Sequence, residues 1–399
     1  MSGPEYPALY LKRGEDKRLR AGHLWVFSNE VDTAKSPLTE FPVGGPVWIL
    51  DASGKPLGTG YANPSTLICG RLVDRGGKPL DRSLITHRLN VALSLRERLR
   101  TEPFYRLVFG ETDGLPGLII DRFDDIVVAQ LNTAGMQAVR EEVQAAIEKV
   151  LKPSALVWKN DSSARALEGL PEQVEVAFGT VPERVRVKEG GLVFELDVLH
   201  GQKTGWFYDQ HDNRDRLQPW VKNAKVLDLF SYVGAWGIRA AVFGAEDVTC
   251  VDASASAVAQ IEANAGLNGF AGCVHAIRAD AFEFLREARA EKRHWDVVIL
   301  DPPAFIKRRK DFKEGALAYR RINEMAMQVL ARDGILVSAS CSHHMGRAAL
   351  LEAIQTGARH LDRQVQVLCQ LQQAVDHPVH AAIPETDYLK GYIGRVLPA

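Results

Sequence analysis

The second half of the chain alternates strand-like and helix-like segments, and this rhythm constrains the fold more than any other feature. Helix-like stretches such as 255–268 and 319–330 lie between most of the strand-like runs. Such βαβ alternation predicts a mainly parallel, doubly wound sheet. Ligands of these sheets bind at the carboxyl ends of the strands, so we expect functional residues directly after each strand. The strand-like runs are 225–229, 247–251, 274–278, 296–300, 335–339, 365–371 and 392–396.

The chain before residue 200 has a different pattern, and 399 residues suffice for two to three domains at roughly 150 residues each. Residues 1–75 contain short strand-like runs at 8–12, 46–50 and 57–61, separated by Gly and Pro, which predict a small β-barrel or sandwich. Residues 76–184 mix helices at 82–100 and 137–150 with strands at 117–121 and 126–130, which predicts a small α/β domain. Two alternating runs within 185–200 predict a hairpin that leads into the last domain, 201–399.

The bulk composition is that of a soluble globular protein, with 46% hydrophobic and 25% charged residues. Because 49 basic residues face 50 acidic ones, a nucleic-acid partner would have to be bound by local basic patches. No signal-peptide pattern and no apolar run of about 18 residues is present, so we expect a cytoplasmic protein without membrane contact. The five scattered cysteines form no CxxC pair and indicate neither disulfides nor a metal site.

Acidic residues follow four successive predicted strands, at Asp228, Asp252, Asp280 and Asp301. A dinucleotide site would need a G-x-G-x-x-G turn for the pyrophosphate, whereas only Gly234 and Gly237 occur here. A carboxylate at position 228 would repel a pyrophosphate but suits the cationic amine of S-adenosylmethionine. The pattern therefore favours S-adenosylmethionine as the cofactor.

Each strand end can then be matched to a part of this cofactor. Asp228 and the loop that follows it would face the methionine part, Asp252 with Ala253 the ribose, and Asp280 with Ala281 or Phe282 the adenine. The polar stretch that opens the last domain is interpreted as a wall or lid of the same site. The predicted cofactor-binding residues are Gln202, Lys203, Thr204, Asp228, Phe230, Ser231, Tyr232, Gly234, Asp252, Ala253, Asp280, Ala281, Asp301 and Pro302.

A cysteine, Cys341, follows the fifth strand, at a position that lies beside the Asp301 loop in a doubly wound sheet. A thiolate there would have a clear use if the target is pyrimidine C5: attack at C6 makes C5 nucleophilic enough to accept a methyl group. His343 or His344 would lower the pKa of the thiol, and Asp301 would steady the ring or act as base. The predicted catalytic residues are Cys341 and Asp301.

Two basic clusters are candidate RNA contacts. Lys307, Arg308 and Arg309 follow the Asp301 loop, where phosphate contacts would be useful. Near the start of the chain, the basic residues Lys12, Arg13, Lys17 and Arg18 precede an aromatic segment, which is compatible with RNA binding.

These motifs resemble the RlmI-like family of ribosomal RNA large-subunit cytosine-C5 methyltransferases over essentially the whole chain. The matching segments are 11–29, 111–121, 201–210, 228–232, 301–303, 340–342, 377–379 and 388–391. The resemblance implies an N-terminal RNA-binding PUA domain, a small α/β domain and a class I (Rossmann-like) methyltransferase domain. It also implies S-adenosylmethionine as cofactor, a cytosine of large-subunit ribosomal RNA as target, Cys341 as nucleophile, and pairing into a homodimer.

The chain departs from the family pattern at Val233–Ala235, His211 and Ala304, and none of these changes removes a proposed catalytic group. Related RNA cytosine methyltransferases carry a second cysteine in the Asp301-type loop. This loop has none, so another group must help to release the product. Two alternatives remain open: methylation of an exocyclic amine such as guanine N2, with Cys341 as a packing residue, and a non-catalytic RNA-binding assembly factor.

Overall fold

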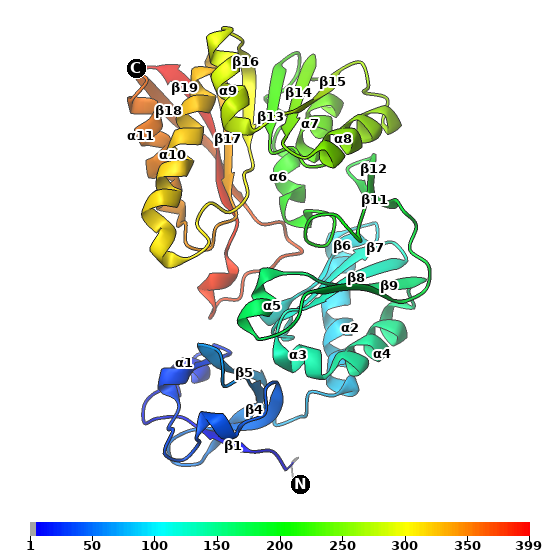
Figure 1. Ribbon diagram of the computed structural model, residues 1–399, viewed down its shortest axis with the longest axis vertical. Helices are drawn as coiled ribbons and strands as arrows, with labels where there is room; N and C mark the ends of the chain where they lie inside the picture. The colour runs from blue at the N-terminus through cyan, green and yellow to red at the C-terminus, as the bar shows by residue number, and fades with distance from the viewer. Residues whose placement is uncertain (1–4) are drawn as a thin grey trace. The chain divides into compact units, whose positions relative to one another are not determined.

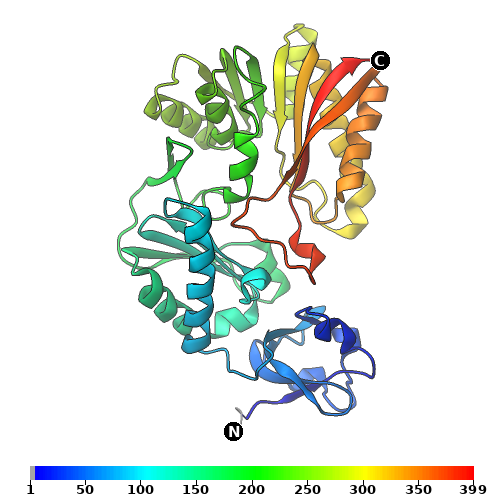
Figure 2. The same cartoon turned by 180° about the vertical axis from the view of Figure 1, so that it is seen from behind.

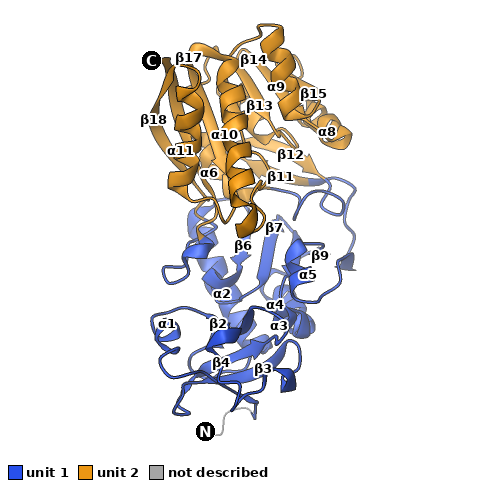
Figure 3. Cartoon of the chain, turned by 60° about the vertical axis from the view of Figure 1, so that its left-hand side comes forward, with its two compact units in different colours: residues 1–185, 197–206, 376–386 blue, residues 186–196, 207–375, 387–399 orange. Residues whose placement is uncertain are grey.

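The computed structural model describes residues 5–399, and its chain divides into two compact units (Figure 3). The first unit comprises Met1–Val185, Asp197–Trp206 and Asp376–Thr386, and the second comprises Arg186–Leu196, Phe207–Val375 and Asp387–Ala399. The first four residues of the predicted 1–75 domain lie outside the described residues. The division groups 197–206 and 376–386 with the first unit, whereas the predicted boundaries at 75, 184 and 200 stay a prediction.

The first unit begins with a five-stranded sheet in the order β1-β3-β4-β5-β2. Its core is a cluster of buried aliphatic side chains that includes Leu9, Val26, Val47 and Leu72. A single sheet is formed here, not the two stacked sheets of a sandwich. The elements are β1 (Ala8–Tyr10), α1 (Lys17–Arg20), β2 (Trp25–Phe27), β3 (Gly45–Leu50), β4 (Pro56–Ala62) and β5 (Ile68–Asp74).

A second five-stranded sheet of the first unit has the order β10-β9-β8-β7-β6 (Figure 1). It is antiparallel except for the parallel pair β8 and β9. The predicted helix 137–150 is two helices, because Thr133 caps an earlier turn and Val139 leaves the helical conformation. The elements are α2 (Arg82–Leu99), β6 (Phe104–Phe109), β7 (Leu118–Phe123), β8 (Ile126–Leu131), α3 (Ala134–Ala138), α4 (Arg140–Leu151), β9 (Ala155–Asn160), α5 (Ser163–Leu167) and β10 (Gln173–Phe178).

The predicted hairpin is present as β11 (Val185–Glu189) and β12 (Leu192–Leu196), and the second unit continues with a seven-stranded sheet. The sheet order is β15-β14-β13-β16-β17-β19-β18, in which β13 to β17 run parallel and β19 pairs antiparallel with both neighbours. The predicted α/β fold with a mainly parallel, doubly wound sheet is therefore confirmed (Figure 2). Its strands are β13 (Lys225–Leu229), β14 (Asp247–Asp252), β15 (Val274–Arg278), β16 (Trp295–Leu300), β17 (Leu330–Ser340), β18 (Arg363–Gln372) and β19 (Lys390–Pro398).

The helices of the second unit cover both faces of this sheet, as the alternation along β13 requires. Leu227 and Leu229 pack into the core shared with the helices α9, α10 and α11. Asp228 points to the other face, where α7 approaches so closely that a Cβ on Gly237 would lie 2.3 Å from the sulfur of Cys250. The helices are α6 (His211–Asp215), α7 (Ala235–Val242), α8 (Ala255–Leu267), α9 (Ala281–Ala290), α10 (Phe312–Gln328) and α11 (Arg347–Arg359).

Within residues 5–399, every helix is too short or too polar to traverse a lipid bilayer.

Candidate functional site

Asp228 closes β13 with its carboxylate fully buried. Its Oδ2 accepts a 3.1 Å hydrogen bond from the backbone N–H of Gly237, whereas Oδ1 has no hydrogen-bond partner among the described residues. Burial raises the pKa of Asp228 to about 7, and the carboxylates of Asp301 and Asp252 raise it further against the hydrogen bonds that lower it. A buried acceptor without a donor is costly, so this site fits a ligand that brings a cationic or N–H donor.

The loop after Asp228 has an unusual backbone conformation. Phe230, Tyr232 and Gly234 have φ angles of 63°, 51° and 84°, a region that favours glycine. Ser231 holds the loop in place: its hydroxyl donates to the Asp228 carbonyl oxygen at 2.7 Å and accepts from the Val251 N–H at 3.0 Å. Strain of this kind persists only where the surroundings impose it, and it concentrates at ligand-binding sites.

Asp252 and Asp280 each have a structural partner as well as a predicted ligand role. Asp252 accepts from the Tyr232 N–H and from the Ser254 N–H, both at 2.9 Å, so it ties the loop after β13 to the end of β14. Asp280 is exposed, and its Oδ1 caps α9 by accepting from the Phe282 and Glu283 N–H groups at 2.9 and 3.1 Å. Ala253 is exposed and Ala281 is buried beside these two acids.

The carboxylate of Asp301 is held from two sides at the end of β16. Gln210 donates from Nε2 to Oδ1 at 2.9 Å, and Trp236 donates from Nε1 to Oδ2 at 3.0 Å. The sequence analysis missed both donors. Trp236 lies within the segment already singled out after Asp228, but only the packing of α7 against β16 shows that its indole reaches Asp301.

Cys341 follows β17 and is half-buried, with its sulfur 4.0 Å from the carbonyl oxygen of Pro302. The flanking residues Ser340 and Ser342 both lie 2.9 Å, hydroxyl to hydroxyl, from the buried Tyr319. These contacts fix the backbone on either side of the thiol. The structure thus brings Cys341 and the Asp301–Pro302 segment together, as adjacent parallel strands do at their carboxyl ends.

Lys390 is a second residue that the sequence analysis missed. It is buried on β19, opposite Ser340, and its Nζ donates a 2.8 Å hydrogen bond to the carbonyl oxygen of Ser342. Burial lowers the pKa of Lys390 to about 8, against the attraction of Asp387 and Cys341, which raises it. The segment 388–391 was noted as a family motif, but its distance in sequence from Cys341 concealed the contact.

The two histidines after Cys341, His343 and His344, are both exposed. The ring of His343 lies 5.6 Å from that of Tyr388, centroid to centroid, and the Tyr388 hydroxyl donates to the carboxylate of Asp209. The predicted effect of these histidines on the thiol stays a prediction.

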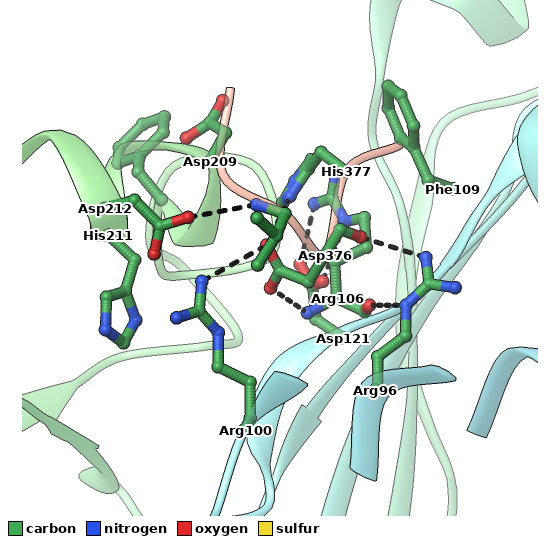
Figure 4. A network of polar contacts seen from close by, with 12 residues as sticks. Arg96, Arg100, Arg106, Phe109, Asp121, Asp209, His211, Asp212, Asp376 and His377 are labelled. Atoms are coloured by element: carbon green, nitrogen blue, oxygen red, sulfur yellow. Dashed lines mark hydrogen bonds and ion pairs between the residues drawn. The ribbon is translucent and has the colours of Figure 1, made fainter. Parts of the chain in front are cut away.

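Gln202, Lys203 and Thr204 belong to the first unit, so the structure does not bring them together with Asp228. Thr204 is fully buried there, and its hydroxyl donates to the Asp121 carboxylate at 2.5 Å. Asp121 also forms a two-pronged ion pair with Arg106, which Figure 4 shows beside Asp376. The Thr204 hydroxyl is therefore already engaged in a buried network, whereas Gln202 and Lys203 are exposed.

The predicted RNA contacts are exposed with one exception. Lys307, Arg308 and Arg309 extend the loop after β16, and Arg308 pairs with Asp311 at 2.8 Å. In the first unit Lys12, Arg13 and Lys17 are exposed, whereas Arg18 is partly buried, pairs with Glu30 at 2.6 Å and stacks on the ring of Phe27. Arg18 is the least available of these cations for a phosphate. Across residues 5–399, no cluster of three or more His, Cys, Asp or Glu is arranged to bind a metal ion.

Two family models match the chain. Residues 9–75 match a PUA-like domain, which agrees with the small β-rich sheet at the start of the first unit. Residues 212–363 match the family described as conserved hypothetical protein 95, which covers most of the second unit.

Curated relatives match along nearly the whole chain. The ribosomal RNA large subunit methyltransferase I of Aliivibrio fischeri is 35% identical over 397 residues, which cover 98% of this chain and 99% of the relative. The protein of the same name from Vibrio cholerae is 34% identical over 398 residues, 98% of this chain and 100% of the relative. A crystal structure described as a methyltransferase complexed with S-adenosylhomocysteine superposes with a TM-score of 0.84 at 21% identity, covering 98% of this chain and 100% of that chain, which shows a shared fold.

Proposed function

Because this chain belongs to the family of ribosomal RNA large subunit methyltransferase I, we propose that it methylates C5 of a cytosine in large-subunit ribosomal RNA. The methyl donor is S-adenosylmethionine, and the nucleophile is Cys341. The observation that carries the proposal is the position of the Cys341 thiol, 4.0 Å from the Pro302 carbonyl and next to the fixed carboxylate of Asp301.

The cofactor proposal is supported by the buried Oδ1 of Asp228, which lacks a donor among the described residues and suits the amine of the methionine part. Asp252 and Asp280 stand at the next two strand ends, where a ribose and an adenine would be held. The fold relative that binds S-adenosylhomocysteine supports the same assignment. When bound, S-adenosylmethionine supplies an electrophilic methyl group. Of the predicted cofactor residues, Thr204 fits least, because its hydroxyl already donates to Asp121.

The proposed reaction is covalent. The thiolate of Cys341 adds to C6 of the cytosine, which makes C5 electron-rich, and C5 then takes the methyl group. A base removes the proton from C5, and the electron pair of that C–H bond re-forms the double bond while the thiolate leaves C6. All atoms balance: the base carries the proton, and Cys341 is regenerated.

The surrounding residues have separate roles in this proposal. The ammonium of Lys390 favours the thiolate of Cys341 by charge, since an opposite charge within about 4–6 Å lowers the pKa of an acid. Asp301, held by Gln210 and Trp236, stays ionised and oriented toward the reacting base. With no second cysteine in this loop, Asp301 and the neutral form of Lys390 are the two groups of the described site that can accept the C5 proton.

The exposed residues Lys12, Arg13, Lys17, Lys307 and Arg309 are proposed to contact RNA phosphates. A cytoplasmic location follows from the proposed ribosomal RNA substrate, and the domain boundaries and the homodimer remain part of the proposal.

The test is methyl transfer to protein-free large-subunit RNA, followed by mass spectrometry of the nucleosides. Wild-type protein should form 5-methylcytosine, Cys341→Ala should form none, and the matched variant Cys369→Ala, at another half-buried cysteine, should keep full activity. N2-methylguanine as the product, or undiminished transfer by Cys341→Ala, contradicts the covalent mechanism. Absence of S-adenosylmethionine binding by calorimetry would instead support a non-catalytic RNA-binding factor.

A further inference from the structure

Helices α9 and α10 lie side by side on the second unit and enclose a groove of about 390 Å³ (Figure 3). Four arginines line it: Arg286 and Arg289 from α9, and Arg320 and Arg321 from α10. The two members on α9 are three residues apart and therefore share one face of that helix. The groove is thus a place where two helices from separate parts of the chain bring four guanidinium groups together.

These four charges are not neutralised by the protein. Among residues 5–399, none of the four arginines forms an ion pair, and the Nε of Arg320 is buried without a hydrogen-bond partner. The acidic lining residue Glu324 is already engaged by His360, at 3.3 Å between Nδ1 and Oε2. A buried guanidinium N–H that no protein group accepts from is costly, so the groove lacks an anion that would complete it.

The chemistry of the lining favours phosphate as that anion. Guanidinium groups present a planar fork of donors that matches two phosphate oxygens at once. The groove is also continuous in sequence with a basic segment: α10 carries Lys313 seven residues before Arg320, on the same side of the helix and about 10 Å away at 1.5 Å per residue. A row of cations at such intervals suits the repeated phosphates of a nucleic-acid strand better than a single small anion.

We propose that the groove of Arg286, Arg289, Arg320 and Arg321 binds backbone phosphates of the RNA substrate, away from the reacting base. Lys313 lies between this groove and the basic loop 307–310, so the RNA strand would run along α10. The identification of RNA as the source of the phosphates rests on the proposed function. The groove contributes affinity and not base specificity, because phosphate contacts carry no sequence information.

The experiment measures the affinity of the full-length protein for a large-subunit RNA fragment between 50 and 200 mM salt. The test variant is Arg286→Gln/Arg289→Gln, since both side chains are exposed and their loss leaves the core intact. The control is Lys222→Gln/Arg332→Gln, which removes the same charge from exposed positions outside the groove. Each lost phosphate contact reduces the salt exponent by about 0.7 to 0.9. Two lost contacts should therefore shrink the affinity change over this fourfold salt range by about tenfold, and the control should behave as wild type.

A second pair of variants isolates Arg320, whose partly buried position makes a neutral replacement riskier. Arg320→Lys should keep the salt exponent, and Arg320→Gln should lower it by about one contact. An unchanged exponent in the test variant overturns the proposal. So does binding of inorganic phosphate by calorimetry that depends on the groove while RNA affinity does not, because the ligand is then a free anion.

Failure of this proposal and failure of the proposed function are distinguishable. With saturating RNA, the groove variant should methylate as fast as wild type, whereas Cys341→Ala should lose methylation and keep the wild-type salt exponent.

Discussion

Lys390 donates a 2.8 Å hydrogen bond from Nζ to the carbonyl oxygen of Ser342, the residue that follows Cys341. The contact places a buried cation beside the only cysteine at the carboxyl edge of the described sheet. Burial lowers the pKa of Lys390 to about 8, so at neutral pH most molecules keep the ammonium and a minority hold a free amine. A single residue can thus favour the thiolate in one step and accept a proton in another.

Replacing Lys390 by Met should raise the pKa at which Cys341 reacts by about 1 to 2 units, because a neighbouring opposite charge shifts an acid by that amount. The measurement is the rate of iodoacetamide alkylation of the Cys341 peptide as a function of pH, read by mass spectrometry. Lys222→Met, at an exposed lysine, is the control and should leave the profile unchanged. An identical profile for Lys390→Met would show that the ammonium does not act on the thiol.

The affinity for S-adenosylhomocysteine should rise with pH up to about 7 and then level off. Burial raises the pKa of Asp228 to about 7, so the carboxylate that would bind the cationic amine is protonated below that pH. Below pH 7 we expect a loss of about tenfold in affinity for each pH unit. Calorimetry from pH 5.5 to 8 measures this dependence. In Asp228→Asn the affinity should be lower and flat over the same range, and a persisting slope would assign the titration to another group.

Trp236→Phe should lower the rate of methyl transfer about 10- to 100-fold while the protein stays folded. The indole donates to Oδ2 of Asp301 at 3.0 Å, and a hydrogen bond to a charged group contributes about 1.5 to 3 kcal/mol. The loss should appear in kcat more than in KM, since Asp301 is proposed to act on the reacting base. Trp220→Phe, at a half-exposed tryptophan, is the matched control. Equal kinetics for the two variants would argue against a role for this contact.

Asp376→Asn should destabilise the first unit by about 3 to 5 kcal/mol, as the loss of one partner from a buried ion pair does. Burial alone would raise the pKa of Asp376, but His377, Arg100 and the Arg106 N–H together lower it to about 2 (Figure 4). Because the folded-state pKa is depressed, this stabilisation is present above about pH 4 and is lost as the pH falls toward 2. Urea unfolding at pH 7 and pH 3 measures both effects.

The exposed Asp125→Asn is the control for Asp376→Asn and should unfold as wild type does. A difference between Asp376→Asn and wild type that stays constant from pH 7 to pH 2 would contradict the assigned pKa.

Much of the second unit followed from the sequence because the signals there are local. The strands 225–229 and 274–278 have the predicted bounds, since each is a short apolar run ended by polar residues. The helix α10 begins at Phe312, seven residues before the predicted start at 319, because its first turns are polar and lack the apolar period. The break between α3 and α4 was missed for a related reason: a cap at Thr133 overrode a pattern that looked continuous.

The sequence by itself determined the βαβ rhythm, the four acids at the strand ends and the position of Cys341 after the fifth strand, because each is a property of neighbouring residues. Only the tertiary structure decided which distant groups meet there. The insertion of β19 between β17 and β18 brings Lys390 to Ser342, and the packing of α9 on α10 brings Arg286 and Arg320 to one groove. Periodicity shows which face of an element is apolar, but the order of strands and the pairing of helices depend on the free energy of the whole packed core.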